Sequence, residues 1–177
     1  MKGAKSMPPY DTLDGYELRA YFLKECFNAL MNISQKSFDI RWFTNINDFI
    51  EQYMDKYYVQ QNNGYHWIDI FHYTGDIIGF AVVMTDHGKY ILEHVYVVPR
   101  FRHQGFAEYA LDEFFNNQKS RITKVYAYTF TKNTRANRFL KKYFETMHGM
   151  IETPIKPTPY WIDEKEQKAI CFNAEIE

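Results

Sequence analysis

The chain has 177 residues, with 21 basic and 22 acidic side chains and a formal net charge of −1. This length is typical of one domain with a core large enough to need no disulfide or metal. The near-neutral charge disfavours a general nucleic-acid-binding surface, which normally has a basic excess. Aromatic residues make up 19% of the chain, which disfavours intrinsic disorder.

Two cysteines, Cys26 and Cys171, are too few for a disulfide framework and suit a reducing cytosol, so we expect a cytoplasmic protein. The longest apolar run, 77–84, is far shorter than the roughly 20 residues that span a bilayer, and no membrane partner is expected. Residues 1–10 lack the apolar stretch of a secretory signal and are expected to form a flexible arm. Because we see no repeat or linker, residues 1–177 are expected to form a single domain.

The first half of the chain changes from helical to strand periodicity. Apolar residues at helical spacing predict two helices, and aromatic and β-branched residues then predict three strands joined by tight turns. Pro99 lacks the N–H that a sheet ladder needs and ends the third strand. The helices are expected over about 13–31 and 46–57, and the strands over 65–73, 77–85 and 90–98.

The second half alternates helix and strand. Gly105 stands at the entrance of a helix that contains Leu111, and a half-buried strand follows over 125–130. A helix over about 136–147, a proline-rich loop and a last strand over 168–176 complete the chain. This order predicts an α/β or α+β domain with three layers.

The segment Val97-Val98-Pro99-Arg100-Phe101-Arg102-His103-Gln104-Gly105-Phe106-Ala107 joins a strand to a helix and carries two arginines. A helix N-terminus exposes N–H groups and a partial positive charge, where phosphate binds well. Gly105 and Ala107 keep side chains small where a ligand must approach the backbone, and Arg102 supplies a guanidinium suited to phosphate oxygens. The segment predicts a diphosphate site, although a plain helix start after a turn shows the same short pattern.

This segment and the residue four positions beyond it resemble the acetyl-CoA-binding signature of the GNAT acyl-CoA N-acyltransferase superfamily, V-x-P-x-[FY]-R-x-x-G-x-[GA] with Leu four residues later. The matching residues are Val97, Pro99, Phe101, Arg102, Gly105, Ala107 and Leu111. Asn133-Thr134-Arg135-Ala136 is similar to a second element of the family, and Gly149-Met150 stands where the family has Gly-Phe. The resemblance extends over about 65–150.

The resemblance implies a GNAT-like fold with a central mixed, mainly antiparallel sheet flanked by helices. It also implies an N-acetyltransferase that moves the acetyl group of acetyl-CoA to a primary amine, with no metal. In this family pantetheine lies between two splayed strands, and backbone amides at the following helix hold the diphosphate. The cofactor-binding residues implied here are Val95, Tyr96, Val97, Arg102, His103, Gln104, Gly105, Phe106, Ala107, Glu108 and Asn133.

The amine must attack in its neutral form. Removing the proton of a lysine amine with a pKa of about 10.4 costs roughly 4–5 kcal/mol at pH 7, so a general base is useful. Strand alternation puts Glu93 on the face of Val97 and His94 on the opposite face. Several members of the family carry a working glutamate at this position, so the resemblance implies Glu93 as the base, with a surface carboxylate as the alternative. The family's tyrosine acid is replaced by Leu140. Tyr143, one turn later, is the candidate catalytic acid, although its place in the apolar stripe of the helix favours a core tyrosine.

Other reactive side chains are expected to be structural. Cys26 and Cys171 fall in apolar patterns, so direct attack in a ternary complex is favoured over a covalent enzyme intermediate. His66 and His72 share a strand face but lie ~20 Å apart along it, too far for one metal ion. No metal site is therefore expected.

Three functional alternatives stay open. The main expectation is the N-acetyltransferase. Leu140 motivates a catalytically impaired module that binds acyl-CoA and regulates a partner, and the balanced charge disfavours a toxin that acetylates aminoacyl-tRNA. The acceptor amine (small molecule, peptide or protein) and the oligomeric state, including a homodimer, are not decided by the sequence. Aromatic candidates for an acceptor pocket, or simply for the core, are Trp42, Phe43, Tyr57, Tyr58, Tyr160 and Trp161.

Overall fold

The computed structural model describes residues 15–33, 46–59, 64–118, 122–147, 149–155 and 169–176. The arm expected at 1–10 and the aromatic pairs at 42–43 and 160–161 lie outside these residues. The elements are α1 (Gly15–Ile33), α2 (Ile46–Met54), a π-helical turn η3 (Asp55–Val59), β1 (Tyr65–Phe71), β2 (Ile77–Asp86), β3 (Lys89–Val97), a 3₁₀ turn η5 (Pro99–Phe101), α3 (Phe106–Asn116), β4 (Lys124–Phe130), α4 (Thr134–Thr146), β5 (Met150–Ile155) and β6 (Ala169–Glu175).

The strands form one six-stranded sheet in the order β1-β2-β3-β4-β6-β5. Every neighbouring pair is antiparallel except β3 and β4, which run parallel. The predicted meander of the first three strands and the mixed, mainly antiparallel sheet are therefore confirmed. Strand β5 was not expected, because the proline-rich loop was predicted to begin there.

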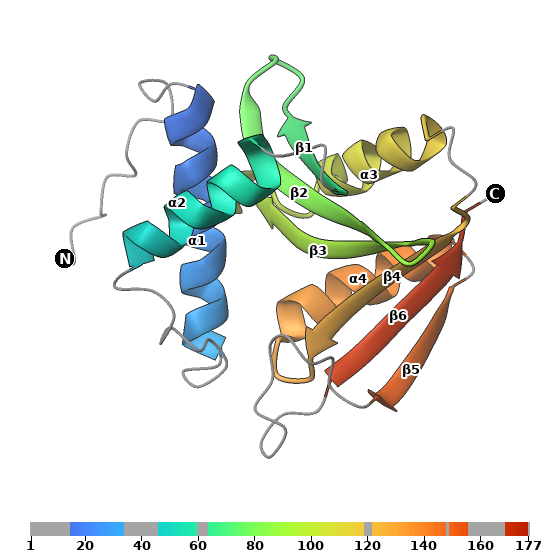
Figure 1. Cartoon of the computed structure of the whole chain (residues 1–177). Helices are drawn as coiled ribbons and strands as arrows, with labels where there is room; N and C mark the ends of the chain where they lie inside the picture. The colour runs from blue at the N-terminus through green and yellow to red at the C-terminus, as the bar shows by residue number, and fades with distance from the viewer. Residues whose placement is uncertain are drawn as a thin grey trace.

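Helices cover both faces of the sheet (Figure 1). On one side α1 and α2 bury Phe22 and Met54 against Phe80 of the sheet. On the other side α3 and α4 bury Leu111 and Phe144 against further strand residues. The predicted three layers are confirmed. Among the described helices, none has both the length and the apolar character needed to cross a membrane.

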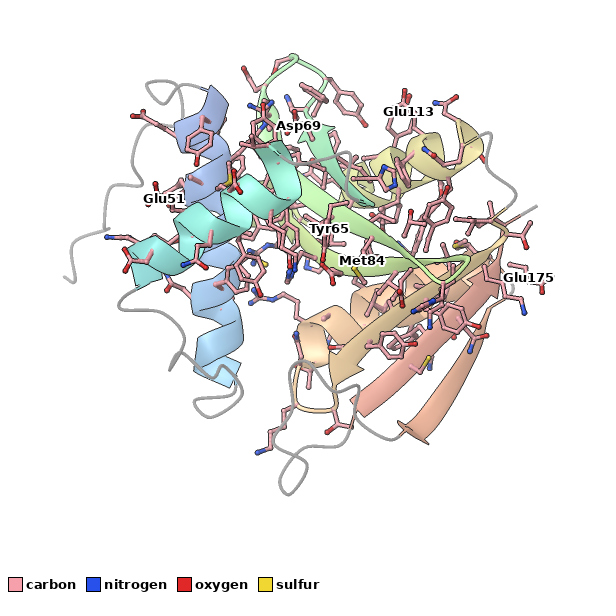
Figure 2. All side chains as sticks on the ribbon, in the orientation of Figure 1. Glu51, Tyr65, Asp69, Met84, Glu113 and Glu175 are labelled. Carbon is pink, nitrogen blue, oxygen red and sulfur yellow. The ribbon has the colours of Figure 1, made fainter. Side chains whose placement is uncertain are left out.

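Helix α1 is tied to β1 by a polar contact at the edge of its apolar face. The Arg19 guanidinium donates to both carboxylate oxygens of Asp69, with Nε to Oδ1 at 2.8 Å. Trp67 also donates its indole N–H to Asp69, at 3.0 Å. Figure 2 labels Asp69 near one end of β1 and Tyr65 at the other. These contacts fix the helix over the face of the sheet on which the candidate site lies.

The parallel strands β3 and β4 separate along their length. Their ladder has three residue pairs, which end at Leu92↔Ala127. Beyond this point β3 continues to Val97 while β4 continues to Phe130, paired on its other edge with β6. The register between β2 and β3 shifts at the same level, where one β3 residue is added as a β-bulge. A bulge bends its strand, so it accounts for the place at which β3 leaves β4.

Candidate functional site

The loop after β3 places a helix N-terminus at the open end of the splayed strands. His103 and Gly105 have positive φ angles of 63° and 84°, and Gly105 is the N-cap of α3. Within the part of the chain that the structure describes, no side chain caps this helix, so the amides of its first turn keep their hydrogen-bonding capacity. A Cβ on Gly105 would meet no atom of the described residues within 4 Å, which leaves space above the turn open. The turn therefore has the geometry of an anion site.

The side chains of this loop point mostly elsewhere. Phe106 and Ala107, the first two residues of α3, are buried in the core. Gln104 Nε2 donates a hydrogen bond to Arg100 O at 3.1 Å. Lys142 Nζ of α4 lies 3.6 Å from a carboxylate oxygen of Glu108. What the loop offers to a ligand is thus chiefly its backbone.

Arg102 reaches back to the strand rather than toward the helix. Its Nε donates to Val97 O at 2.7 Å, and its guanidinium carbon lies 5.6 Å from the centre of the Tyr96 ring. Its charge opposes the effect of burial on Cys26, whose thiol pKa is nevertheless raised to about 12 by desolvation. The guanidinium therefore lies on the α1 side of the sheet, where it ties the loop to the end of β3.

The bulge in β3 changes which side chains share a face. Val82 pairs with His94 and Val83 with Leu92, so Glu93 is the additional residue. Leu92 packs in the α3–α4 core, whereas His94 contacts the α1–α2 side. Val97 packs beside α3, so the expectation that His94 lies on the opposite face is confirmed. The expectation that Glu93 shares the face of Val97 is wrong, because a bulge adds a residue and breaks the two-residue period.

Glu93 is half-buried, and its carboxylate oxygen Oε2 is buried. Its Oε2 has no hydrogen-bond partner among the described residues. Desolvation raises the pKa of Glu93, and the Lys56 charge and the nearby Tyr57 hydroxyl offset part of this effect. The Tyr57 hydroxyl favours the charged carboxylate without the geometry of a hydrogen bond. A carboxyl with a raised pKa is a stronger base than an exposed carboxylate, and this one lies beside an opening in the sheet.

His94 is the neighbour of Glu93 on the same side of the sheet. Its ring lies 5.3 Å from Phe27 of α1 and 5.6 Å from Tyr57, measured between centroids. Burial, aided by the Lys56 charge, lowers the pKa of His94 to about 4. The imidazole is therefore neutral at pH 7 and adds no charge beside Glu93.

Three tyrosines line this part of the site, and only Tyr57 was a candidate from the sequence. Tyr53 and Tyr57 come from the end of α2 and from η3, and their ring centroids lie 4.7 Å apart. The ring centroid of Tyr65, at the start of β1, lies 5.0 Å from that of Tyr57. The sequence predicted one helix through 57, but the chain changes to π-helical hydrogen bonding after Met54. Such turns are frequent at functional sites.

Tyr143 has a hydrogen-bond partner on α3. Its hydroxyl donates to Asp112 Oδ1 of α3 at 3.0 Å, and its ring stacks on Phe139 with 5.9 Å between centroids. Burial, followed by the charge of Asp112, raises the pKa of Tyr143. The side chain joins α3 to α4 within their common core, and Leu140 is buried in the same core.

Asn133 is the N-cap of α4. Its Oδ1 accepts a hydrogen bond from Ala136 N at 3.2 Å, and the residue is buried. This contact explains an Asn at this position without a ligand, since Asn is among the best N-cap residues. Any contact with a cofactor would use the other atom of its amide, Nδ2.

Two further features lie outside this site. An open acidic groove lies between α1 and α2, lined by Tyr16, Asp48, Glu51, Gln52, Asp55 and Val59. Apart from Tyr16, these residues lie on the stripe of α2 and η3 opposite the buried Ile50, Met54 and Tyr57. Within the described residues, no three His, Cys, Asp or Glu side chains gather closely enough to hold a metal ion.

Comparison with known proteins gives one family. A sequence model of the Acetyltransferase (GNAT) family matches residues 27–145, which include β1 to β4 and nearly all of α4. A search of curated proteins found no significant match.

Solved structures with the same fold are distant in sequence. A protein from Desulfovibrio desulfuricans assigned to the GNAT family is 18% identical, covers 96% of this chain and 95% of its own, and has a TM-score of 0.62. The microcin C7 self-immunity acetyltransferase MccE, in complex with acetyl-CoA and AMP, is 13% identical over 89% and 87%, with a TM-score of 0.62. The ribosomal-protein-S18-alanine N-acetyltransferase from Escherichia coli is 16% identical over 93% and 91%, with a TM-score of 0.53.

Proposed function

This chain belongs to the acetyltransferase (GNAT) family, and on that basis we propose that it transfers the acetyl group of acetyl-CoA to a primary amine. The observation that carries the proposal is the combination of two features. The ladder between β3 and β4 ends at Leu92↔Ala127, and an uncapped helix N-terminus with open space above Gly105 lies at the wide end of the resulting gap. Together they offer a slot for an extended arm and a site for its diphosphate.

In this proposal pantetheine lies beside residues 93–97 of β3 as an added strand, with main-chain contacts to Val95, Tyr96 and Val97. The diphosphate takes the amides of residues 103–108, where the helix dipole favours negative charge. Arg102 contributes by holding the loop against Val97 O. Asn133 caps α4 and presents its Nδ2 beside the arm. MccE, which has the same fold, was crystallised with acetyl-CoA, and this supports the choice of cofactor.

Transfer would be direct, within a ternary complex. Glu93 takes the proton of the acceptor ammonium, because its raised pKa makes it a stronger base than an exposed carboxylate. The Cys26 thiol, with its pKa near 12, holds its proton and is not a competent nucleophile. Tyr143 is engaged by Asp112, so the CoA thiolate leaves without a proton from this side chain. The protein would work in the cytoplasm, where its two free cysteines stay reduced.

The test is calorimetric titration of the purified protein with acetyl-CoA and with CoA. Gly105→Ala places a methyl group over the proposed diphosphate, and we expect binding to weaken by about tenfold or more, roughly 1.4 kcal/mol. Gly88→Ala is the matched control. Gly88 has a similar φ of 77° and nothing within 4 Å of its Cβ position, but lies in the β2–β3 turn. Both variants carry the same backbone strain, about 1–2 kcal/mol, so equal affinities in the two would contradict the proposed site.

A second candidate function is a module that binds acyl-CoA without turnover. It is favoured by the burial of Leu140, where the family commonly has its acid, and by the engagement of Tyr143. Thiol release from acetyl-CoA across a panel of amines separates the two functions. Release that Glu93→Gln abolishes supports the enzyme, and binding without release supports the module.

A further inference from the structure

The side chain of Lys56 lies at the border of the candidate site. Lys56 belongs to η3, and its Nζ lies 4.7 Å from the ring centre of Tyr65, 5.3 Å from that of Tyr57 and 5.8 Å from that of Tyr53. An ammonium within about 6 Å of a ring centre is attracted to the face of that ring. Three such rings hold the amine in one place, although the lysine residue as a whole is exposed to solvent.

The same amine is close to the proposed base. Lys56 Nζ lies 5.3 Å from the Tyr57 ring centre, and this ring lies 5.6 Å from that of His94, the neighbour of Glu93 in β3. In keeping with this geometry, the Lys56 charge lowers the pKa of Glu93 and that of His94. Tyr57 links the two groups, because its ring contacts the ammonium while its hydroxyl lies near the carboxylate. An amine and a proton acceptor are thereby brought together on the α1–α2 side of the sheet.

The position of Glu93 also fixes where an acyl group would arrive. Glu93 follows Leu92, the last β3 residue paired with β4, and therefore stands at the narrow end of the gap. It lies four residues before Val97, about 13 Å along the strand. If the cofactor arm runs from the helix N-terminus along β3, as proposed above, its thioester end reaches the level of Glu93 and Lys56.

We propose that Lys56 is a self-acetylation site, an internal amine that accepts the acetyl group from bound acetyl-CoA. This inference rests on the proposed function. Glu93 takes a proton from the Lys56 ammonium, and the neutral Nζ attacks the thioester carbonyl. The new C–N bond forms as the C–S bond breaks, and the nitrogen gives its second proton to the departing thiolate, which leaves as CoA thiol. Solvent then takes the proton from Glu93.

Acetylation would change the site. It removes the charge that holds Lys56 over the three rings, because a neutral amide has no cation–π attraction. It also removes the Lys56 contribution that lowers the pKa of Glu93, so the base would be more strongly held in its protonated form. Self-acetylation would therefore slow later turnovers at neutral pH.

The experiment is a time course of the full chain with acetyl-CoA, followed by intact mass and by peptide mapping of every acetylated lysine. Lys89 is the internal control for chemical acetylation. Its Nζ lies 5.0 Å from the centre of the Tyr126 ring, but it begins β3, about 13 Å before Glu93. We expect Lys56 to react at least about a hundred times faster than Lys89, the lower end of what a positioned base contributes.

Variants and a parallel titration separate the possible outcomes. Glu93→Gln should bring the Lys56 rate down toward that of Lys89, and Lys56→Arg should lose the fast phase while acetyl-CoA still binds. Equal rates at Lys56 and Lys89 in protein shown by calorimetry to bind acetyl-CoA would overturn self-acetylation and leave the proposed function standing. A failure to bind acetyl-CoA would overturn the proposed function itself.

Discussion

Tyr143 is either a structural tyrosine or a catalytic acid, and the loss of its hydrogen bond to Asp112 has different effects in the two cases. Tyr143→Phe removes this bond without changing the shape of the core. A hydrogen bond to a charged group contributes about 1.5–3 kcal/mol, but Asp112 is exposed and water can replace its partner, so we expect a loss of about 1 kcal/mol. For a chain of this length, 1 kcal/mol lowers Tm by about 2–4 °C.

A catalytic role predicts a different result. An acid in the transfer step contributes roughly 10²–10⁴-fold to the rate, so its loss would lower kcat by at least about a hundredfold. The raised pKa of Tyr143 argues against this role, because a phenol above its usual value of about 10 gives up its proton unfavourably to a thiolate whose acid has a pKa of about 8.5. We therefore expect kcat to stay within about twofold of wild type once the variant is folded.

Thermal unfolding and steady-state rates of Tyr143→Phe, Asp112→Ala and the double variant test this reasoning. The structural role predicts a coupling energy of about 1 kcal/mol between the two positions and little change in kcat. A loss of activity of a hundredfold or more with an unchanged Tm would refute it and return Tyr143 to the position of catalytic acid.

Three further predictions concern β3 and its surroundings. Glu93→Gln should remove the rise of kcat/KM with pH that follows ionisation of Glu93. It should also raise Tm at neutral pH but not in acid, because a carboxyl whose pKa is raised by burial destabilises the fold once it ionises and has no such effect while protonated. A pH series of rates and Tm checks both expectations. A Tm difference between wild type and Glu93→Gln that does not change with pH would contradict the burial of the Glu93 carboxyl. Asn133→Ala should lower stability by about 1 kcal/mol in denaturant unfolding, whereas Asn133→Asp, which keeps the cap, should not; equal losses would exclude the cap to Ala136 N as the cause. Gly79→Ala should cost about 3 kcal/mol or more, because its Cβ would lie 2.1 Å from Tyr96 O, and a near-normal denaturation midpoint would contradict this packing.

The cofactor motif was accessible from the sequence because it is local. A strand end, a loop and a helix start follow one another within eleven residues. The backbone preferences of Gly105 and Pro99 hold whatever residues surround them. The structure has the expected helix with Gly105 as its N-cap in the left-handed region. The local rules for the strand end and for the helix start therefore agreed with the tertiary fold.

The candidate catalytic face was not accessible in the same way. Alternation cannot reveal a bulge, since Glu93 and His94 look like any two successive strand residues until the register with Val82 and Val83 is known. The tyrosines around Lys56 come from α2, η3 and β1, and their meeting depends on how these elements pack.

Strand β5 was missed for a related reason. Pro154 is typical of a loop and is excluded from central strands, but β5 forms the edge of the sheet, where a proline is tolerated. The pairing with β6 shifts register between Glu152 and Ile155, around this proline. The proline is visible in the sequence, but only the strand order shows that its strand lies at the edge of the sheet.

The most direct measurement of the central claim is amide hydrogen exchange across β3 with and without acetyl-CoA. If the cofactor arm pairs with the strand where β4 has separated, amides in residues 93–97 should gain protection. Those of Tyr90 to Leu92, which are already within the ladder to β4, should change little, and the amides of residues 103–108 should be protected by the diphosphate. Protection that appears elsewhere, with residues 93–97 unchanged under saturating acetyl-CoA, would contradict the account.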